Sequence, residues 1–171
     1  MSLILRPPES SDEPRCRELH AQLALEDFEF LHRDGPWAQV LAETEREARG
    51  VDLPEGRVPC DFLLAEVDGV IVGRVSIRRA LNDFLLEVGG HVGYAVAPEH
   101  RRRGHATEIL RQSVARLADA GVTRVLVTCD DDNIASAAVI EACGGVLEDV
   151  RTAPDAAPKR RYWIQATAAA G

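Results

Sequence analysis

Lysine is nearly absent from this chain of 171 residues, in which Lys159 stands beside 19 arginines. No apolar run approaches the roughly 20 residues of a membrane span, so no transmembrane helix is predicted. The first eight residues have no long apolar core, so no secretory signal is expected either. The four cysteines show no C-x-x-C spacing and no histidine cluster beside them. We therefore expect no metal or redox site, and a reducing cytoplasm as the location.

The balance of charge is acidic but uneven. The chain has 28 acidic and 20 basic residues, a net charge of −8. Proteins that bind nucleic-acid phosphates are usually basic, so the composition argues against a nucleic-acid partner. Residues 1–55 carry 13 acids and six arginines, whereas residues 98–124 carry six arginines and three acids. Such asymmetry can separate two binding surfaces, although solvated helix faces would produce it as well.

The predicted elements form one α/β domain, and the length suits a single core that needs no disulfides. A strand–helix–strand unit over 91–129 requires its two strands to lie parallel in one sheet, while Asp68-Gly69 predicts an antiparallel hairpin. The sheet is therefore expected to be mixed and mostly antiparallel, and 168–171 to be a frayed tail. Strands are expected at 3–5, 62–67, 70–78, 91–97, 122–129, 146–152 and 160–166. Helices are expected at 12–26, 37–49, 105–120 and 133–142.

One segment, residues 92–107, predicts a site for a pyrophosphate. It reads as a strand, an arginine-rich turn and the start of a helix, whose first amides lack partners and lie at the positive end of the helix dipole. Gly104 lets the backbone approach a ligand closely, and Ala106 is too small to block it. The segment contains neither the Walker loop nor the G-x-G-x-x-G dinucleotide fingerprint. An exposed basic loop is the alternative interpretation.

This segment resembles the GCN5-related N-acetyltransferase (GNAT) superfamily, in particular its little-characterised branch of predicted acetyltransferases. The family pattern Q/R-x-x-G-x-G/A is met by Arg101-x-x-Gly104-x-Ala106. The later pattern N-x-x-A/S is met by Asn133-x-x-Ser136, with glycine following at the usual distance. The resemblance is good over 60–150 and extends to 1–59 only through the number of helices.

The resemblance implies a single GNAT-like domain over 1–171. Its parts would be an acceptor-side half (1–59), a core that binds coenzyme A (60–150), and a C-terminal strand and tail (151–171). The co-substrate would be acetyl-CoA, with no metal. Backbone amides of 102–106 would hold its pyrophosphate, and two strand residues would bind the pantetheine arm. The residues implied for the cofactor are Val96, Ala97, Arg101, Arg102, Arg103, Gly104, His105, Ala106, Thr107, Asn133 and Ser136.

Acetyl transfer to an amine requires a base for the amine and is helped by an acid for the departing thiolate. Many family members carry a glutamate where this chain has His91, so His91 is a candidate base, and Glu87 is a second one. The family's usual acid is a tyrosine where this chain has Ile140, which cannot donate a proton. Tyr162, Tyr94, a water molecule or direct loss of thiolate would have to replace it. Structural roles for these residues remain open.

The function expected from these residues is transfer of an acetyl group from acetyl-CoA to an amine of a small molecule or peptide, by direct attack in a ternary complex. A non-catalytic acyl-CoA-binding or sensory module is the alternative, because Ile140 replaces the usual acid. A cationic acceptor is expected from the acidic N-terminal third. No nucleic acid or membrane partner is expected, and the protein would be a monomer or a homodimer.

Overall fold

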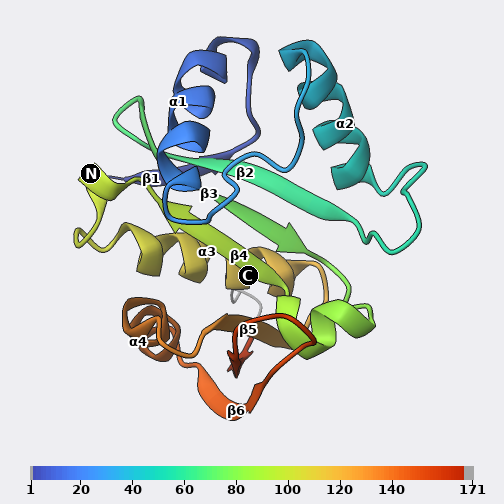
Figure 1. Ribbon diagram of the computed structural model, residues 1–171, viewed down its shortest axis with the longest axis vertical. Helices are drawn as coiled ribbons and strands as arrows, with labels where there is room; N and C mark the ends of the chain where they lie inside the picture. Colours follow the sequence, from blue (N-terminus) through green and yellow to red (C-terminus); the bar gives the residue numbers. More distant parts are fainter. Residues whose placement is uncertain (1, 168–171) are drawn as a thin grey trace.

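A seven-stranded sheet forms the centre of the computed structural model, which describes residues 2–167 (Figure 1). The strand order is β1-β2-β3-β4-β5-β7-β6, and neighbours are antiparallel except β4 and β5, which are parallel. The predicted mixed α/β sheet with a parallel crossover is confirmed. The strands are β1 (Leu3–Arg6), β2 (Cys60–Val67), β3 (Val70–Arg78), β4 (Val92–Val96), β5 (Arg124–Asp130), β6 (Val146–Arg151) and β7 (Lys159–Gln165). The helices are α1 (Glu13–Ala24), α2 (Trp37–Arg49), α3 (His105–Asp119) and α4 (Ile134–Ala142), with short helical segments η1 (Ser10–Asp12), η2 (Leu85–Gly89) and η3 (Pro98–His100).

Local chemistry sets the ends of several elements. Pro14 lies in the first turn of α1, where no partner for its missing N–H is needed. α2 ends at Gly50, whose φ of 69° is left-handed and therefore suits glycine. Asp68 and Gly69 have φ values of 51° and 78°, as a two-residue turn between antiparallel strands requires. The helices and hairpin predicted at these positions are confirmed.

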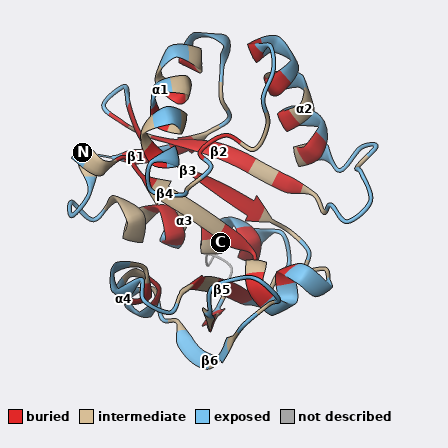
Figure 2. Ribbon diagram, in the orientation of Figure 1, coloured by how far each residue is buried: buried red, intermediate tan, exposed pale blue. Residues whose placement is uncertain are grey.

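Helices cover both faces of the sheet (Figures 1 and 2). α1 and α2 pack on one face against a cluster that includes Phe30, Phe62 and Leu64. α3 and α4 pack on the other face, where Ile109 and Ile140 are fully buried. The middle of β5 is inaccessible to solvent, as its continuous apolar sequence predicts for a strand covered on both sides.

β4 and β5 diverge soon after they meet. β3 and β4 are paired at five positions, but within the described chain β4 and β5 are paired only at Val92 and Val127. A regular ladder would continue along the remaining residues of β4. The two central strands therefore leave a gap that widens from Val92 toward the turn preceding α3.

The structure differs from the sequence prediction in a few places. α1 ends at Ala24, and β4 begins one residue after His91. The segment preceding β4, which has no clear sequence pattern, forms the π-helical η2. Cys129 is buried, whereas Cys143 is partly exposed. The predicted frayed tail at 168–171 lies outside the described residues.

Candidate functional site

The edge of β4 presents backbone groups to the gap. Ala97 N–H donates to Val72 O at 2.8 Å, so Ala97 and Ala95 direct their backbone groups toward β3. Because successive residues of a strand alternate in this respect, the backbone groups of Tyr94 and Val96 face the gap. An extended ligand can pair with such an open strand edge. The N–H of Val96 thus faces the gap, its carbonyl oxygen accepts from Arg101, and the N–H of Ala97 is already used by β3.

The N-terminus of α3 lies where the gap is widest. Gly104 is its N-cap residue, with a φ of 82°, and it has no side chain to cap the helix. Within residues 2–167, apart from Gly104 and its two chain neighbours, no heavy atom lies within 4 Å of the point where a Cβ would be placed on Gly104. The amides of His105, Ala106 and Thr107 belong to the first turn and so lack intrahelical partners. These groups together form a concave, positively polarised surface that suits a diphosphate.

The arginines of the turn are placed differently from one another. The Arg101 guanidinium forms hydrogen bonds of 3.1 and 2.6 Å with the two carboxylate oxygens of Glu26, and its Nε donates to Val96 O at 3.1 Å. Arg101 thus joins the turn to the segment after α1 instead of extending freely toward a phosphate. Arg103 donates to Glu99 O at 3.2 Å. Arg102 is exposed, with a left-handed φ of 62°, and remains available to an anion.

A side-chain hydrogen bond crosses the gap on the face covered by α3 and α4. The hydroxyl of Tyr94, on β4, lies 2.9 Å from Ser136 Oγ, in the first turn of α4 beyond β5. Burial raises the pKa of Tyr94 to about 12, so its hydroxyl stays protonated at neutral pH. Asn133 caps α4 by accepting the Ser136 N–H at 3.0 Å. Ser136 therefore lies beside Tyr94 of β4, whereas the Asn133 side chain is used to cap α4.

His91 joins the two strands at the closed end of the gap. The ring Nδ1 of His91 accepts the Leu126 N–H at 2.8 Å. The backbone N–H of His91 donates to Leu126 O at 2.7 Å. The other ring nitrogen, Nε2, has no hydrogen-bond partner in the described chain. Because no side-chain nitrogen or oxygen there is both fully buried and without a partner, Nε2 must be in contact with solvent. Burial and the nearby Arg78 lower the pKa of His91 to about 4. The ring is therefore neutral, and Nε2 carries the remaining proton.

The other two candidate acid–base residues lie away from the gap. Glu87 is in η2 and forms an exposed ion pair of 2.6 Å with Arg151. Tyr162 is almost completely buried in β7, and its hydroxyl donates to Glu141 at 3.2 Å. β5 separates Tyr162 from the gap. Ile140 is fully buried in the core and occupies no catalytic position.

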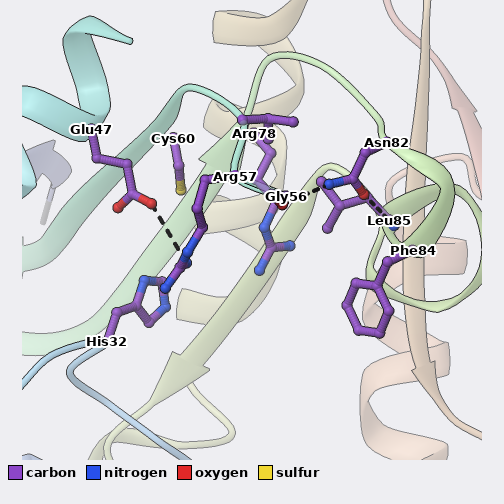
Figure 3. Close-up of a pocket in the computed structure, with 10 residues that line it drawn as sticks. His32, Glu47, Gly56, Arg57, Cys60, Arg78, Asn82, Phe84 and Leu85 are labelled. Carbon is purple, nitrogen blue, oxygen red and sulfur yellow. Dashed lines mark hydrogen bonds and ion pairs between the residues drawn. The ribbon is translucent and has the colours of Figure 1, made fainter. Parts of the chain in front are cut away.

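A cavity of about 250 Å³ opens on the face of the sheet covered by α1 and α2 (Figure 3). Arg57 extends from the loop before β2 toward His32 and forms an ion pair of 3.5 Å with the buried Glu47. Burial and the surrounding arginines lower the pKa of His32 to about 3, so this ring is neutral. The lining residues are His32, Glu47, Gly56, Arg57, Val58, Cys60, Arg78, Asn82, Phe84 and Leu85.

Many acids of the N-terminal third are paired with arginines. Glu47 is contacted by Arg33 at 2.9 Å as well as by Arg57. The other pairs include Asp12 with Arg6, Glu13 with Arg17, Glu18 with Arg15, Glu26 with Arg101 and Glu43 with Arg33. These pairs involve six of the 13 acids in residues 1–55, and the cationic acceptor stays a prediction.

The sequence gives little sign of two features of this site. Tyr94 is among the candidate acids of the sequence, but its contact with Ser136, 42 residues later, is made only by the fold. The cavity combines the loop at 56–58, β2, β3 and η2, and His32 has no motif around it. The one available signal for Tyr94 is its place in the strand before the arginine-rich turn.

The arrangement has the parts that acyl transfer needs. One track runs from the uncapped start of α3 along the open edge of β4 to the closed end of the gap at Val92. A neutral imidazole and a protonated phenol flank this track. Among residues 2–167 no group of three or more potential metal ligands is found. None of the helices in that part of the chain is long and apolar enough to cross a membrane.

Comparison with known proteins identifies the family. The model of the acetyltransferase (GNAT) domain matches residues 2–146, whereas no curated protein sequence matches. Mycobacterium smegmatis RimJ, solved with CoA-disulfide, is 22% identical, with a TM-score of 0.72 over 96% of this chain and 82% of its own. RimL, the ribosomal L7/L12 α-N-protein acetyltransferase, solved with coenzyme A, is 17% identical, with a TM-score of 0.72 over 99% and 97%. The microcin C7 self-immunity acetyltransferase MccE, solved with acetyl-CoA and AMP, is 16% identical, with a TM-score of 0.67 over 95% and 92%. The family match covers well over half of the chain, which therefore belongs to the GNAT family of acetyltransferases.

Proposed function

We propose that this protein is an acetyl-CoA-dependent N-acetyltransferase that transfers the acetyl group directly to an amine. The observation that carries the proposal is the continuous track from the uncapped N-terminus of α3 to the gap between β4 and β5. The wide end of this track suits a diphosphate, and the open edge of β4 suits an extended arm that contains amides. Coenzyme A contains both a diphosphate and such an arm. The RimJ, RimL and MccE structures hold coenzyme A or acetyl-CoA on the same fold.

The residues present fit the co-substrate at three places. The first-turn amides at Gly104 to Thr107, with the exposed Arg102, would bind the pyrophosphate. The backbone groups of Tyr94 and Val96 would pair with the arm. When bound, acetyl-CoA supplies an activated thioester. Direct attack needs no covalent enzyme intermediate, because both substrates would be held side by side.

His91 and Tyr94 are the proposed acid–base residues. His91 is neutral at physiological pH, but its Nε2 already carries a proton, because Nδ1 accepts the Leu126 N–H. It can accept the amine's proton, directly or through a water molecule, only when Nδ1 releases its hydrogen bond to the Leu126 N–H, because no other ring nitrogen has a free lone pair. Tyr94 keeps its proton because burial raises its pKa to about 12, and it would give this proton to the departing thiolate.

Two measurements test the proposed function. Calorimetry measures acetyl-CoA binding, and a thiol-release assay with a panel of primary amines measures transfer. Binding together with amine-dependent thiol release is the expected result. Absence of binding would exclude both the enzyme and any acyl-CoA-binding module.

A non-catalytic acyl-CoA-binding or sensory module is the second candidate, and Ile140 at the position of the family's usual acid favours it. Such a module would bind acetyl-CoA without releasing thiol in the presence of any amine. Tyr94 favours the enzyme over the module. Its protonated hydroxyl at the gap would be a proton donor on β4, in place of the tyrosine that is missing at Ile140 of α4.

We further propose that the acceptor is a small molecule or peptide amine bound on the face covered by α1 and α2. RimL acts on a ribosomal protein, while MccE was solved with AMP as well as acetyl-CoA, so the fold serves different acceptors. The four reduced cysteines favour a cytoplasmic location.

A further inference from the structure

The cavity beside Arg57 and Arg78 meets the closed end of the gap. Arg78 Nη1 donates to Gly89 O at 3.3 Å and Gly90 O at 3.2 Å, immediately before His91. Its terminal nitrogens also lie 3.8 Å from the position where a Cβ would be placed on Gly93, in β4. The diphosphate end of the track is at the opposite end of β4. A thioester at the end of the arm would therefore meet this cavity, so the cavity is where an acceptor would enter.

The charge of the cavity is positive. Its lining contains Arg57 and Arg78 against one carboxylate, Glu47. Arg33, at 2.9 Å, already pairs with that carboxylate, so Glu47 does not neutralise both lining arginines. The neutral His32 adds no charge of either sign. An ammonium group has no unpaired acid to bind among the lining residues.

The two arginines have free donors. Arg57 is exposed, and its contact with Glu47 is long, at 3.5 Å. In the part of the chain that the structure describes, Arg78 uses only Nη1 for hydrogen bonds, so its second terminal nitrogen can donate to a ligand. Guanidinium groups match the geometry of carboxylates, to which they donate paired hydrogen bonds.

Resting on the function proposed above, we propose that the acceptor is a small amine that itself carries a carboxylate, which Arg57 and Arg78 bind in this cavity. The volume of about 250 Å³ suits a molecule of amino-acid size. The positive surroundings also favour the unprotonated amine, the form that attacks, because nearby like charges destabilise an ammonium ion. The same chemistry is present in a free amino acid and in an acidic residue at the end of a peptide.

The test compares matched acceptors in the thiol-release assay. Each common L-amino acid is paired with its carboxamide, and peptides with aspartate as first or second residue are paired with their asparagine counterparts. We expect the carboxylate member of a pair to be the better substrate, and the pairs that respond distinguish free amino acids from peptides. Diamines provide the cationic comparison. Equal turnover of carboxylates, carboxamides and diamines would overturn this inference and leave N-acetyltransfer standing.

Two variants test whether Arg57 causes the preference for carboxylate over carboxamide acceptors. Arg57→Gln should lower the preference for carboxylate over carboxamide about tenfold to a hundredfold, as loss of a hydrogen bond to a charged group does. Arg49→Gln, which removes an exposed arginine at the end of α2 outside the cavity lining, should leave the preference unchanged. An unchanged preference in Arg57→Gln would overturn the assignment.

A binding measurement covers the case in which no acceptor releases thiol. The arginine Nε–Hε resonances are followed by NMR while each amino acid, or its carboxamide, is added without acetyl-CoA. Shifts caused by carboxylates alone, and lost in Arg57→Gln, support the site, whereas no shift excludes it. Calorimetry with acetyl-CoA tests the proposed function separately, so the two failures are distinguishable.

Discussion

Replacing Gly104 by glutamate should abolish tight acetyl-CoA binding while leaving the fold intact. A Cβ at this position meets no atom of the described chain within 4 Å, so the substitution causes no clash. The left-handed φ of 82° costs a non-glycine residue about 1–2 kcal/mol. A carboxylate in the first turn recovers about 0.3–1 kcal/mol from the helix dipole. The net loss of unfolding free energy should therefore be about 1 kcal/mol.

The loss of binding should be much larger than this loss of stability. Two unit charges about 4 Å apart repel by about 4 kcal/mol at an effective dielectric constant of 20. Gly104 is exposed, so solvent reduces the repulsion, and we expect the Kd for acetyl-CoA to rise about tenfold to a thousandfold. The added side chain also covers the amides that would bind the diphosphate.

Gly121 at the other end of α3 provides a matched control. Its φ is 90°, and no described atom lies within 4 Å of the position of its Cβ. Gly121→Glu therefore has a similar backbone cost, but its charge lies about 25 Å away at 1.5 Å per helical residue. Thermal unfolding and calorimetry should show two folded variants, of which only Gly104→Glu has lost affinity. Equal affinity in the two variants would refute the placement of the pyrophosphate at this helix.

Three further predictions concern the acid–base residues and the sheet. Tyr94→Phe should lower kcat about tenfold to a hundredfold, with little change in acetyl-CoA affinity, because it removes the proposed proton donor; if Tyr162→Phe has this effect instead, the proton donor is Tyr162. Since the pKa of His91 is lowered from its usual 6.5 to about 4, the stability contributed by its neutral ring is present above pH 6.5 and is lost as the pH falls toward 4. His32, whose pKa is also lowered, contributes to the total loss over that range, so the test is a difference: urea unfolding should show a loss up to about 3 kcal/mol smaller in His91→Asn than in the parent protein, and an equal loss would contradict the assignment. Arg74→Met should lower the unfolding free energy by about 3 kcal/mol. The Arg74 guanidinium donates to the carbonyl oxygens of residues 29, 30 and 93, and the substitution leaves these oxygens unpaired. Denaturation midpoints that match the parent protein would refute this role.

Much of the fold could be predicted because its signals are local. The turn at Asp68-Gly69, the glycine that ends α2 and the periodic apolar residues of α3 each depend on a few neighbouring residues. The parallel pairing of β4 and β5 followed from the helix between them, since a crossover is needed to bring such strands together. The segment of η2 was not predicted, because its π-helical turn has no distinct sequence pattern.

The candidate site was predictable only in part. Gly104 and the first turn of α3 are contiguous, so their sequence already describes a surface that suits a phosphate. The contacts that the site side chains make depended on residues far away in the sequence. Arg101 is engaged by Glu26, 75 residues earlier, and Tyr162 by Glu141 in the core. Neither pairing could be read from spacing.

The sequence by itself determined that this chain has no predicted membrane helix, few lysines, a crossover at its centre and a helix start after an arginine-rich turn that predicts an anion site. These properties follow from composition and from neighbours along the chain. Only the tertiary structure decided where the charges act. It paired many of the N-terminal acids with arginines and left Arg57 and Arg78 in a cavity beside β4. The physical reason is that an ion pair depends on distance in space, which the order of residues does not specify.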